Sequence, residues 1–383
     1  MVVTAIKDAK TRQNHNRLLL GGFLCVGVRI VARSHFPVLP AAKAAFQRAL
    51  HAWYRRQHRR LPWRVAPSLY RTVVSEFMLQ QTQIKTVLPY FERWMRALPD
   101  FAALAAASEA RVLKLWEGLG YYSRVRHLHR LARVLVARPT PPRTTEAWRE
   151  LPGVGPYTAA AITSLAFGAP AACVDGNVVR VLARLTADGT TFRDSAAAAR
   201  HFTPLADALL NRDDPGLHNQ AMMELGALVC SRHHPRCTIC PVRRFCTAAR
   251  RGDPENYPRL ASKKIKRRAV TRVWCEHAGR LLLHRAAAGA RRLAGLHELP
   301  TPADLGFNEA AVRATPRLAR KQRGLTNHRI TESIHAVVLT AAQCRRLASR
   351  PALRWTPLAK LDHITLSGPH RRWIRELLTL PTR

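Results

Sequence analysis

The sequence has few acidic residues. Only 24 Asp and Glu balance 63 Lys and Arg among 383 residues, so the formal net charge is +39. Such a protein is attracted to polyanions, and its affinity for them depends strongly on salt. Arginine outnumbers lysine along the whole chain, which a drift in genome composition also produces. The charge therefore favours a nucleic-acid partner without establishing one.

The sequence also lacks a long apolar run. The stretch from Leu18 to Ala32 follows several basic residues and contains Arg29. It is shorter than the roughly 20 residues that a membrane-spanning helix needs. We treat residues 1–40 as an extension outside the folded core and expect no membrane partner.

The eight cysteines are not evenly spread. Four thiols fall within the spacing Cys230-x6-Cys237-x2-Cys240-x5-Cys246. This distribution excludes a small secreted disulfide scaffold and indicates a metal site in a reducing compartment. Zinc usually takes two close cysteine pairs, and only the middle pair has that separation, so zinc is the alternative. The other four are expected to be buried thiols: Cys25, Cys173, Cys275 and Cys344.

Strand-like alternation is almost absent before residue 250. We predict an all-α domain over 41–250 and a polar, basic linker over 251–269. The remainder, 270–383, has the pattern of a small α+β domain. Its strands are expected at 273–275, 280–284 and 335–340, with a terminal helix at 371–378. Within the first domain, apolar spacing predicts helices over 73–88 and 101–116.

A glycine turn precedes an alanine-rich helical stretch. Gly153 and Gly155 allow φ > 0, and Pro156 suits a first helical turn. Such a turn directs free N–H groups at one point, which favours a phosphate. Asp175 follows twenty residues after Gly155, just before a helix at 178–185. An ordinary helix start and N-cap are the alternative interpretation.

Two further stretches carry polar or aromatic groups in unusual places. Glu76 lies at the edge of an apolar stripe and Gln81 within it, which costs free energy unless something polar docks there. A solvated Glu is the alternative. The loop Gly118-Leu119-Gly120-Tyr121-Tyr122 presents two aromatics, either as core residues or as a wedge for stacked bases.

Together these motifs resemble the MutY-type adenine DNA glycosylases of the endonuclease III-like helix-hairpin-helix superfamily. The likeness covers about residues 46–250. The matching words are LPWR (61–64), SEFMLQQTQ (75–83), GLGYY (118–122), LPGVG (151–155), VDGNVVRVLAR (174–184), NQAMMELGALVC (219–230) and the cysteine loop.

The resemblance implies a mainly α helix-hairpin-helix glycosylase domain with a 4Fe–4S cluster on Cys230, Cys237, Cys240 and Cys246. It implies a Nudix-like C-terminal domain that recognises the lesion, although 270–383 contains no Nudix catalytic box. The expected partner is double-stranded DNA with adenine opposite 8-oxoguanine or guanine. We expect a monomer in the bacterial cytoplasm, associated with the nucleoid.

Two positions separate this family from its relatives. Endonuclease III-type lyases carry a nucleophilic Lys after the glycine turn, where this chain has Tyr157. A thymine–guanine mismatch glycosylase also has Tyr there, so Glu76 is the residue that indicates adenine. A thymine or uracil mismatch glycosylase and a non-catalytic DNA-binding relative are the alternatives.

By this resemblance, Glu76 is the general acid that protonates the flipped adenine, and Asp175 stabilises the oxocarbenium-like sugar. Tyr157 and Asn177 hydrogen-bond these carboxylates or the nucleotide. The implied DNA-binding residues are Arg64, Gln80, Gln81, Tyr121, Gly153, Val154, Gly155 and His328.

Overall fold

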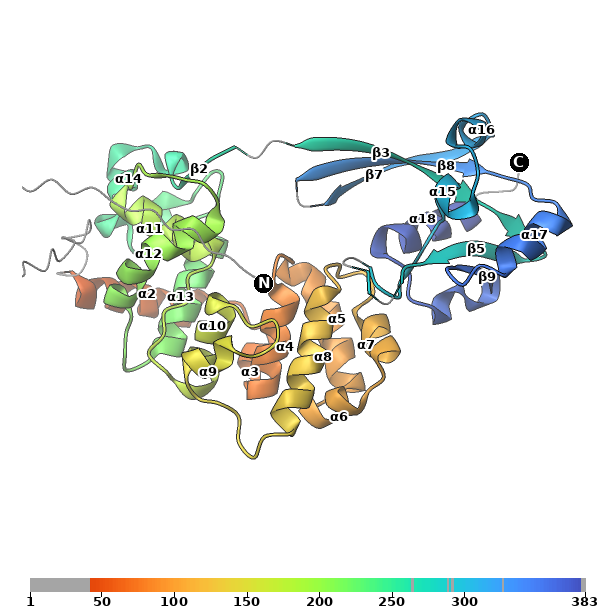
Figure 1. The fold of residues 1–383 in the computed structure, drawn as a ribbon. Helices are drawn as coiled ribbons and strands as arrows, with labels where there is room; N and C mark the ends of the chain where they lie inside the picture. The colour runs from red at the N-terminus through yellow and green to blue at the C-terminus, as the bar shows by residue number, and fades with distance from the viewer. Residues whose placement is uncertain (1–41, 263–264, 288, 291–292, 326, 380–383) are drawn as a thin grey trace, which may run out of the picture.

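The computed structural model describes residues 42–262, 265–287, 289–290, 293–325 and 327–379. The predicted extension 1–40, with Cys25, lies outside the described residues. A helical domain is followed by an α+β domain, as the sequence predicts (Figure 1). Within the described part of the chain, no helix combines the length and apolar character needed to cross a membrane.

The helical domain begins with α2 and ends with α14. Its α-helices are α2 (Lys43–Gln57), α3 (Pro62–Val65), α4 (Leu69–Leu79), α5 (Ile84–Ala97), α6 (Phe101–Ala106), α7 (Glu109–Trp116), α8 (Ser123–Val136), α9 (Thr145–Arg149), α10 (Pro156–Phe167), α11 (Gly176–Thr186), α12 (Ser195–Leu209), α13 (Pro215–Leu228) and α14 (Thr247–Arg251). Short 3-10 helices lie between α13 and α14 at η1 (Cys237–Ile239) and η2 (Arg243–Phe245), and after α14 at η3 (Pro254–Asn256).

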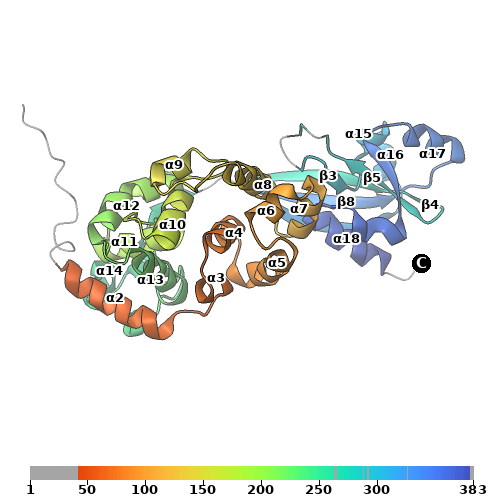
Figure 2. The same ribbon diagram turned by 90° about the horizontal axis from the view of Figure 1, so that it is seen from below.

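This domain has two large apolar cores and a small cluster around Ala160, Ala161 and Cys173. Side chains from α3 to α10, with Leu296 of the C-terminal domain, form the first large core, and side chains of α2 and α11 to α14 form the second. Helix α10 packs against both α4 and α13, and its alanines permit close approach (Figure 2). Residues from α4, α10 and the start of α11 are therefore brought to one place.

Two predicted helices are each divided in the structure. The stretch 73–88 breaks between α4 and α5, where Gln81 has a φ of +56°. The stretch 101–116 breaks between α6 and α7, where the Ser108 side chain accepts a hydrogen bond from the Arg111 N–H. Apolar spacing continues across both breaks, which is why the sequence pattern does not reveal them.

The C-terminal domain contains two sheets. Its strands are β3 (Lys266–Trp274), β4 (Glu276–His277), β5 (Arg280–Arg285), β6 (His297–Glu298), β7 (Arg317–Leu325), β8 (His328–Ala336) and β9 (Leu353–Pro357). Strand β8 pairs in parallel with β3 and antiparallel with β7, whereas β5 pairs antiparallel with β4, β6 and β9. Its helices are α15 (Pro302–Leu305), α16 (Glu309–Arg313), α17 (Ala341–Ala348), η4 (Leu358–His363) and α18 (Gly368–Leu378).

Three expectations differ from the structure. The strand predicted at 335–340 is β8, which begins at His328, and buried Glu332 interrupts its apolar alternation. The first domain contains a short strand, β1 (Thr191–Phe192), which pairs with β2 (Arg259–Leu260) of the predicted linker. That linker is also anchored by Tyr257 in the second core, and β3 begins before residue 269.

Candidate active site

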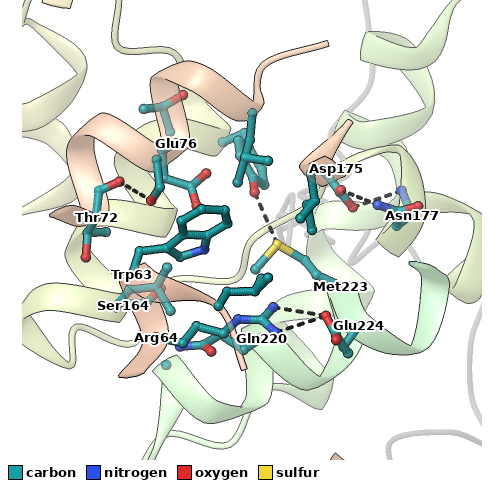
Figure 3. A pocket seen from close by; sticks show the side chains of 18 of the residues that line it. Trp63, Arg64, Thr72, Glu76, Ser164, Asp175, Asn177, Gln220, Met223 and Glu224 are labelled. Atoms are coloured by element: carbon teal, nitrogen blue, oxygen red, sulfur yellow. Dashed lines mark hydrogen bonds and ion pairs between the residues drawn. The ribbon is translucent and has the colours of Figure 1, made fainter. Parts of the chain in front are cut away.

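A cavity of about 1440 Å³ lies where α3, α4, α10, α11 and α13 meet. Figure 3 shows Glu76 and Asp175 facing this cavity from different elements. Of the residues predicted for the site, the cavity is lined by Arg64, Glu76, Gln80, Gln81, Gly153, Gly155, Tyr157, Asp175 and Asn177. The lining does not include Tyr121, Val154 or His328.

Glu76 is buried in the last turns of α4. Its neighbours Phe77 and Met78 are core residues, and Glu76 itself is 6% exposed rather than half-buried. Burial raises the pKa of Glu76 to about 7, and the charge of Asp175 contributes to the increase. A carboxyl group with such a pKa can hold a proton near neutral pH and give it to a bound base.

Asp175 is the N-cap of α11. Its Oδ1 accepts hydrogen bonds from the backbone N–H groups of Asn177 at 2.9 Å and Val178 at 2.8 Å, and its Oδ2 accepts from Asn177 Nδ2 at 2.9 Å. Backbone donors at the start of α11 therefore hold this carboxylate. Burial nevertheless outweighs them and raises the pKa of Asp175, while the three donors act in the opposite direction. Of Glu76 and Asp175, it is Asp175 whose negative charge is supported by several N–H groups.

Tyr157 lies in the first turn of α10, close to both carboxylates. Burial and the charge of Glu76 raise its pKa well above the ordinary value, so the phenol stays neutral. Its hydroxyl lies 3.1 Å from Met223 Sδ, and hydrogen bonding to Tyr157 lowers the pKa of Glu76. The structure thus brings Tyr157 and Asn177 to the carboxylates, as predicted.

The glycine turn between α9 and α10 has one position that requires glycine. Gly153 has a φ of +76°, and a Cβ there would lie 2.4 Å from His127 Cβ. Gly155 does not use the freedom to adopt φ > 0, because its φ is −90° as the N-cap of α10. Val154 is buried, and its N–H donates to the Leu151 carbonyl at 3.2 Å. Its DNA-binding role stays a prediction.

A buried carboxylate that sequence reasoning missed lies across the cavity. Glu224 on α13 is 0% exposed and accepts hydrogen bonds from Arg64 at 3.0 Å and from Arg59 at 2.8 Å (Figure 3). Burial raises its pKa, but the two guanidinium groups lower it to about 2. Glu224 is therefore ionised and fixes Arg64 in the lining. An acidic residue within the largely apolar α13 could have indicated it.

The four clustered cysteines follow α13. Cys230 and Cys240 pack against the second core, and Cys246 belongs to it. Burial raises the pKa of Cys240 to about 12, to which the charges of the other three thiols contribute, so the four lie in one neighbourhood. Four cysteines are the residue type that an iron–sulfur cluster takes as ligands. In the described residues, however, no group of three or more His, Cys, Asp or Glu is placed to hold a metal ion, so the cluster stays a prediction.

Helix α11 connects the cysteine loop to the carboxylates. Arg180 donates to the Cys230 carbonyl at 2.7 Å and to Asn177 Oδ1 at 2.9 Å. Arg184, buried one turn later, donates to Cys230 Sγ at 3.3 Å. The loop therefore supports the helix that Asp175 caps.

His328 lies outside this site. It is the first residue of β8 in the C-terminal domain and lines a separate cavity of about 330 Å³, together with Arg323 and Asn327. Nothing in the site geometry connects it with the carboxylates, so its role in DNA binding stays a prediction.

Residues 74–204 match a known family, the HhH-GPD superfamily base excision DNA repair protein. The chain is 46% identical over 218 residues to the adenine DNA glycosylase of Rattus norvegicus, and 44% identical over 226 residues to that of Homo sapiens. It is 39% identical over 196 residues to the adenine DNA glycosylase of Mycolicibacterium smegmatis. Over about half of its length, the chain is therefore similar to adenine DNA glycosylases.

The similarity is confined to part of each protein. The alignments cover 54%, 56% and 50% of this chain and 42%, 41% and 66% of the rat, human and mycobacterial relatives. The chain thus spans less than half the length of the rat and human relatives it matches. A solved thermostable thymine-DNA glycosylase is 26% identical, with a TM-score of 0.49 over 55% of this chain and 98% of its own.

Proposed function

We propose that this chain is a monofunctional DNA glycosylase that removes adenine mispaired with 8-oxoguanine or guanine in base-excision repair. One observation carries the proposal: Glu76, with a pKa of about 7, and Asp175, held by three N–H groups, line the same cavity. Two carboxyl groups with different environments divide the work in glycosidases in the same manner. The adenine glycosylase relatives support the choice of base.

In the proposed reaction, the adenine nucleotide leaves the duplex and enters the cavity. Protonated Glu76 gives its proton to N7 of the base, because adenine is a poor leaving group as an anion. The bond between C1′ and the base then breaks, and ionised Asp175 stabilises the positive charge that develops on the sugar. Water adds to C1′, and an abasic site and free adenine result.

The same chemistry gives no reason to expect strand cleavage. A lyase needs an amine that attacks C1′, and the position after the glycine turn holds the phenol of Tyr157, flanked by Pro156 and Thr158. The phenol is neutral and partly buried beside Glu76. Tyr157 and Asn177 are therefore proposed to orient the carboxylates.

We also propose that Cys230, Cys237, Cys240 and Cys246 hold a 4Fe–4S cluster. The spacing of the four cysteines and the influence of the other three on the pKa of Cys240 support this assignment, and the cluster would order the loop that carries Arg232, Arg236, Arg243 and Arg244 toward the DNA backbone. Analysis of iron and acid-labile sulfide in the purified protein tests the assignment, because a zinc site would contain neither.

A single-turnover assay tests the excision proposal. Duplexes containing A opposite 8-oxoguanine, A opposite G, and T opposite G are incubated with excess protein, and abasic sites are cleaved with alkali. We expect release of adenine from the first two duplexes and intact strands without alkali. Release of thymine alone would replace the proposal with a thymine mismatch glycosylase, and strand breakage without alkali would indicate a lyase.

A further inference from the structure

A buried carboxylate lies where the helical and C-terminal domains meet. Glu117 follows α7, is 1% exposed, and immediately precedes Gly118–Tyr122, which we call the aromatic loop. Its Oε2 lies 2.7 Å from Lys114 Nζ and 2.6 Å from a guanidinium nitrogen of Arg371, and its Oε1 accepts from the Leu366 N–H at 2.7 Å. Two of these three donors belong to the C-terminal domain.

The C-terminal segment 364–371 contacts both ends of the aromatic loop. The Tyr122 hydroxyl donates to the Leu366 carbonyl at 3.2 Å. A Cβ on Gly368 would lie 3.6 Å from the Gly118 Cα, so the two backbones approach closely. The segment therefore fixes the loop at Glu117, Gly118 and Tyr122.

On its other side, the aromatic loop is joined to the helix that carries Glu76. Arg124 donates to the carbonyls of Leu119 and Gly120, each at 3.2 Å. The same guanidinium donates to the carbonyls of Phe77 at 3.2 Å and Met78 at 3.0 Å, at the C-terminal end of α4. A cation there also interacts favourably with the helix dipole.

Both loops that Arg124 connects contain a strained residue. Tyr121 has a φ of +49° and Gln81 a φ of +56°, and Arg124 lies over the Tyr121 ring at 5.3 Å and bonds the Gln80 carbonyl. Residues other than glycine keep this conformation when their surroundings over-determine it. The surroundings of Tyr121 include the contacts made by the C-terminal domain.

We propose that Glu117 is a positioning residue: through it, docking of the C-terminal domain fixes the conformation of the aromatic loop. Arg124, which bonds both this loop and the end of α4, then fixes the loop relative to the helix that carries Glu76. The proposal rests on the proposed function in one respect, that the aromatic loop enters damaged DNA. The C-terminal domain then does more than contact the lesion strand: it holds the residues that open the duplex in their working conformation.

The test uses the full chain and two variants. Glu117→Gln keeps an oxygen for the Leu366 N–H but removes the charge that pairs with Lys114 and Arg371, and Arg371→Met removes the partner. The matched control is Arg372→Met, because Arg372 is 66% exposed in its side chain and lies 3.8 Å from Glu376. The probe is a duplex with 2-aminopurine beside an adenine opposite 8-oxoguanine, whose fluorescence reports opening of the stack without base release.

At saturating protein, we expect opening about tenfold slower in Glu117→Gln and Arg371→Met, with Arg372→Met at the wild-type rate. The double variant should be no slower than Glu117→Gln alone, because that substitution already breaks the pair with Arg371. Arg371→Lys should recover most of the rate by restoring the charge.

If both variants open the duplex at the wild-type rate and show only a lower melting temperature or weaker DNA binding, the proposal is overturned. The contact of Glu117 with the C-terminal domain would then serve stability alone. If Glu117→Gln does not fold, the Arg371→Met and Arg371→Lys pair decides. If the wild-type protein opens the duplex but releases no adenine, the proposed function is refuted. The opening rates of the variants then decide on their own whether Glu117 positions the aromatic loop.

Discussion

Two buried glutamates, one in each domain, differ in charge state. Glu76 on α4 is 6% exposed and has a pKa raised to about 7, whereas Glu332 on β8 is 0% exposed and has a pKa of about 2. Burial raises both pKa values, but His370, Arg272 and Arg323 lower that of Glu332. Burial alone therefore does not raise the pKa of a carboxyl group; the pKa rises only where nearby cations do not outweigh the effect of burial.

The surroundings of the two side chains explain the difference. Arg272 Nε lies 2.7 Å from Glu332, and Arg323 pairs with its other oxygen. Glu76 faces a cavity, and its polar surroundings are a phenol, a second carboxylate and Arg64, whose charge lowers its pKa less than burial raises it. The ion pairs of Glu332 in the C-terminal domain connect β3, β7, β8 and α18, as expected of residues that stabilise the fold. The helical site has the features of a place for a substrate.

The difference between the two glutamates is tested most directly by replacing each one with glutamine. Glu76→Gln should lower the single-turnover rate of adenine release by about 10²–10⁴-fold, because the amide cannot donate a proton to the leaving base. The measurement is alkali-developed cleavage of an A opposite 8-oxoguanine duplex, with DNA affinity determined in parallel. An active Glu76→Gln protein would remove the basis of the comparison.

Glu332→Gln should act on folding and not on chemistry. Removing one member of this buried cluster leaves Glu298 as the remaining acidic partner of Arg272 and Arg323, and should cost up to about 3–5 kcal/mol of unfolding free energy. Urea denaturation measures this cost, and adenine release per folded molecule should be unchanged. The control is Glu309→Gln, at a partly exposed pair with Arg313, where a change below about 0.5 kcal/mol is expected.

The comparison also shows what the sequence could predict. The start of α10 at Pro156 and the cap at Asp175 depend on rules that act within a few residues, and both are confirmed. Glu76 was expected at the edge of a stripe, and the structure places it deeper because α10 covers that edge. Its polar neighbours could be found only through the likeness to a family.

Contacts between segments that are distant in the sequence could not be predicted from rules that act within a few residues. Glu224 is paired with Arg59, which lies 165 positions earlier, and no local pattern in α13 indicates that partner. Glu332 occupies an inward position of β8 between Ile330 and Ile334, so the strand appeared to begin later than it does. Buried charges conceal the pattern of a strand or helix when their partners come from elsewhere in the fold.

The two acids should also give opposite dependences of stability on pH. Glu76 has a folded pKa above its ordinary 4.5, so its contribution is complete below 4.5 and is lost as the pH rises through 7. Glu332, with a folded pKa of about 2, stabilises above 4.5 and loses this contribution as the pH falls through 2. Glu76→Gln should therefore gain about 2–3 kcal/mol relative to the wild type between pH 5 and pH 8. Parallel stability curves for the two proteins would contradict this assignment.

The smallest expected effect is on the pH dependence of the rate, and it tests whether Glu76 acts as a proton donor or only packs against its neighbours. Because the pKa of Glu76 is about 7, its protonated fraction falls about tenfold per pH unit above that value, and the rate of adenine release should fall with it. The single-turnover rate is measured from pH 6 to pH 9 at saturating protein, where binding does not limit it. Asp175→Asn removes a negative charge that raises the pKa of Glu76, so in the residual activity of that variant the decline should begin at lower pH. A decline at the same pH in both proteins would mean that the titrating group is not Glu76 under the influence of Asp175.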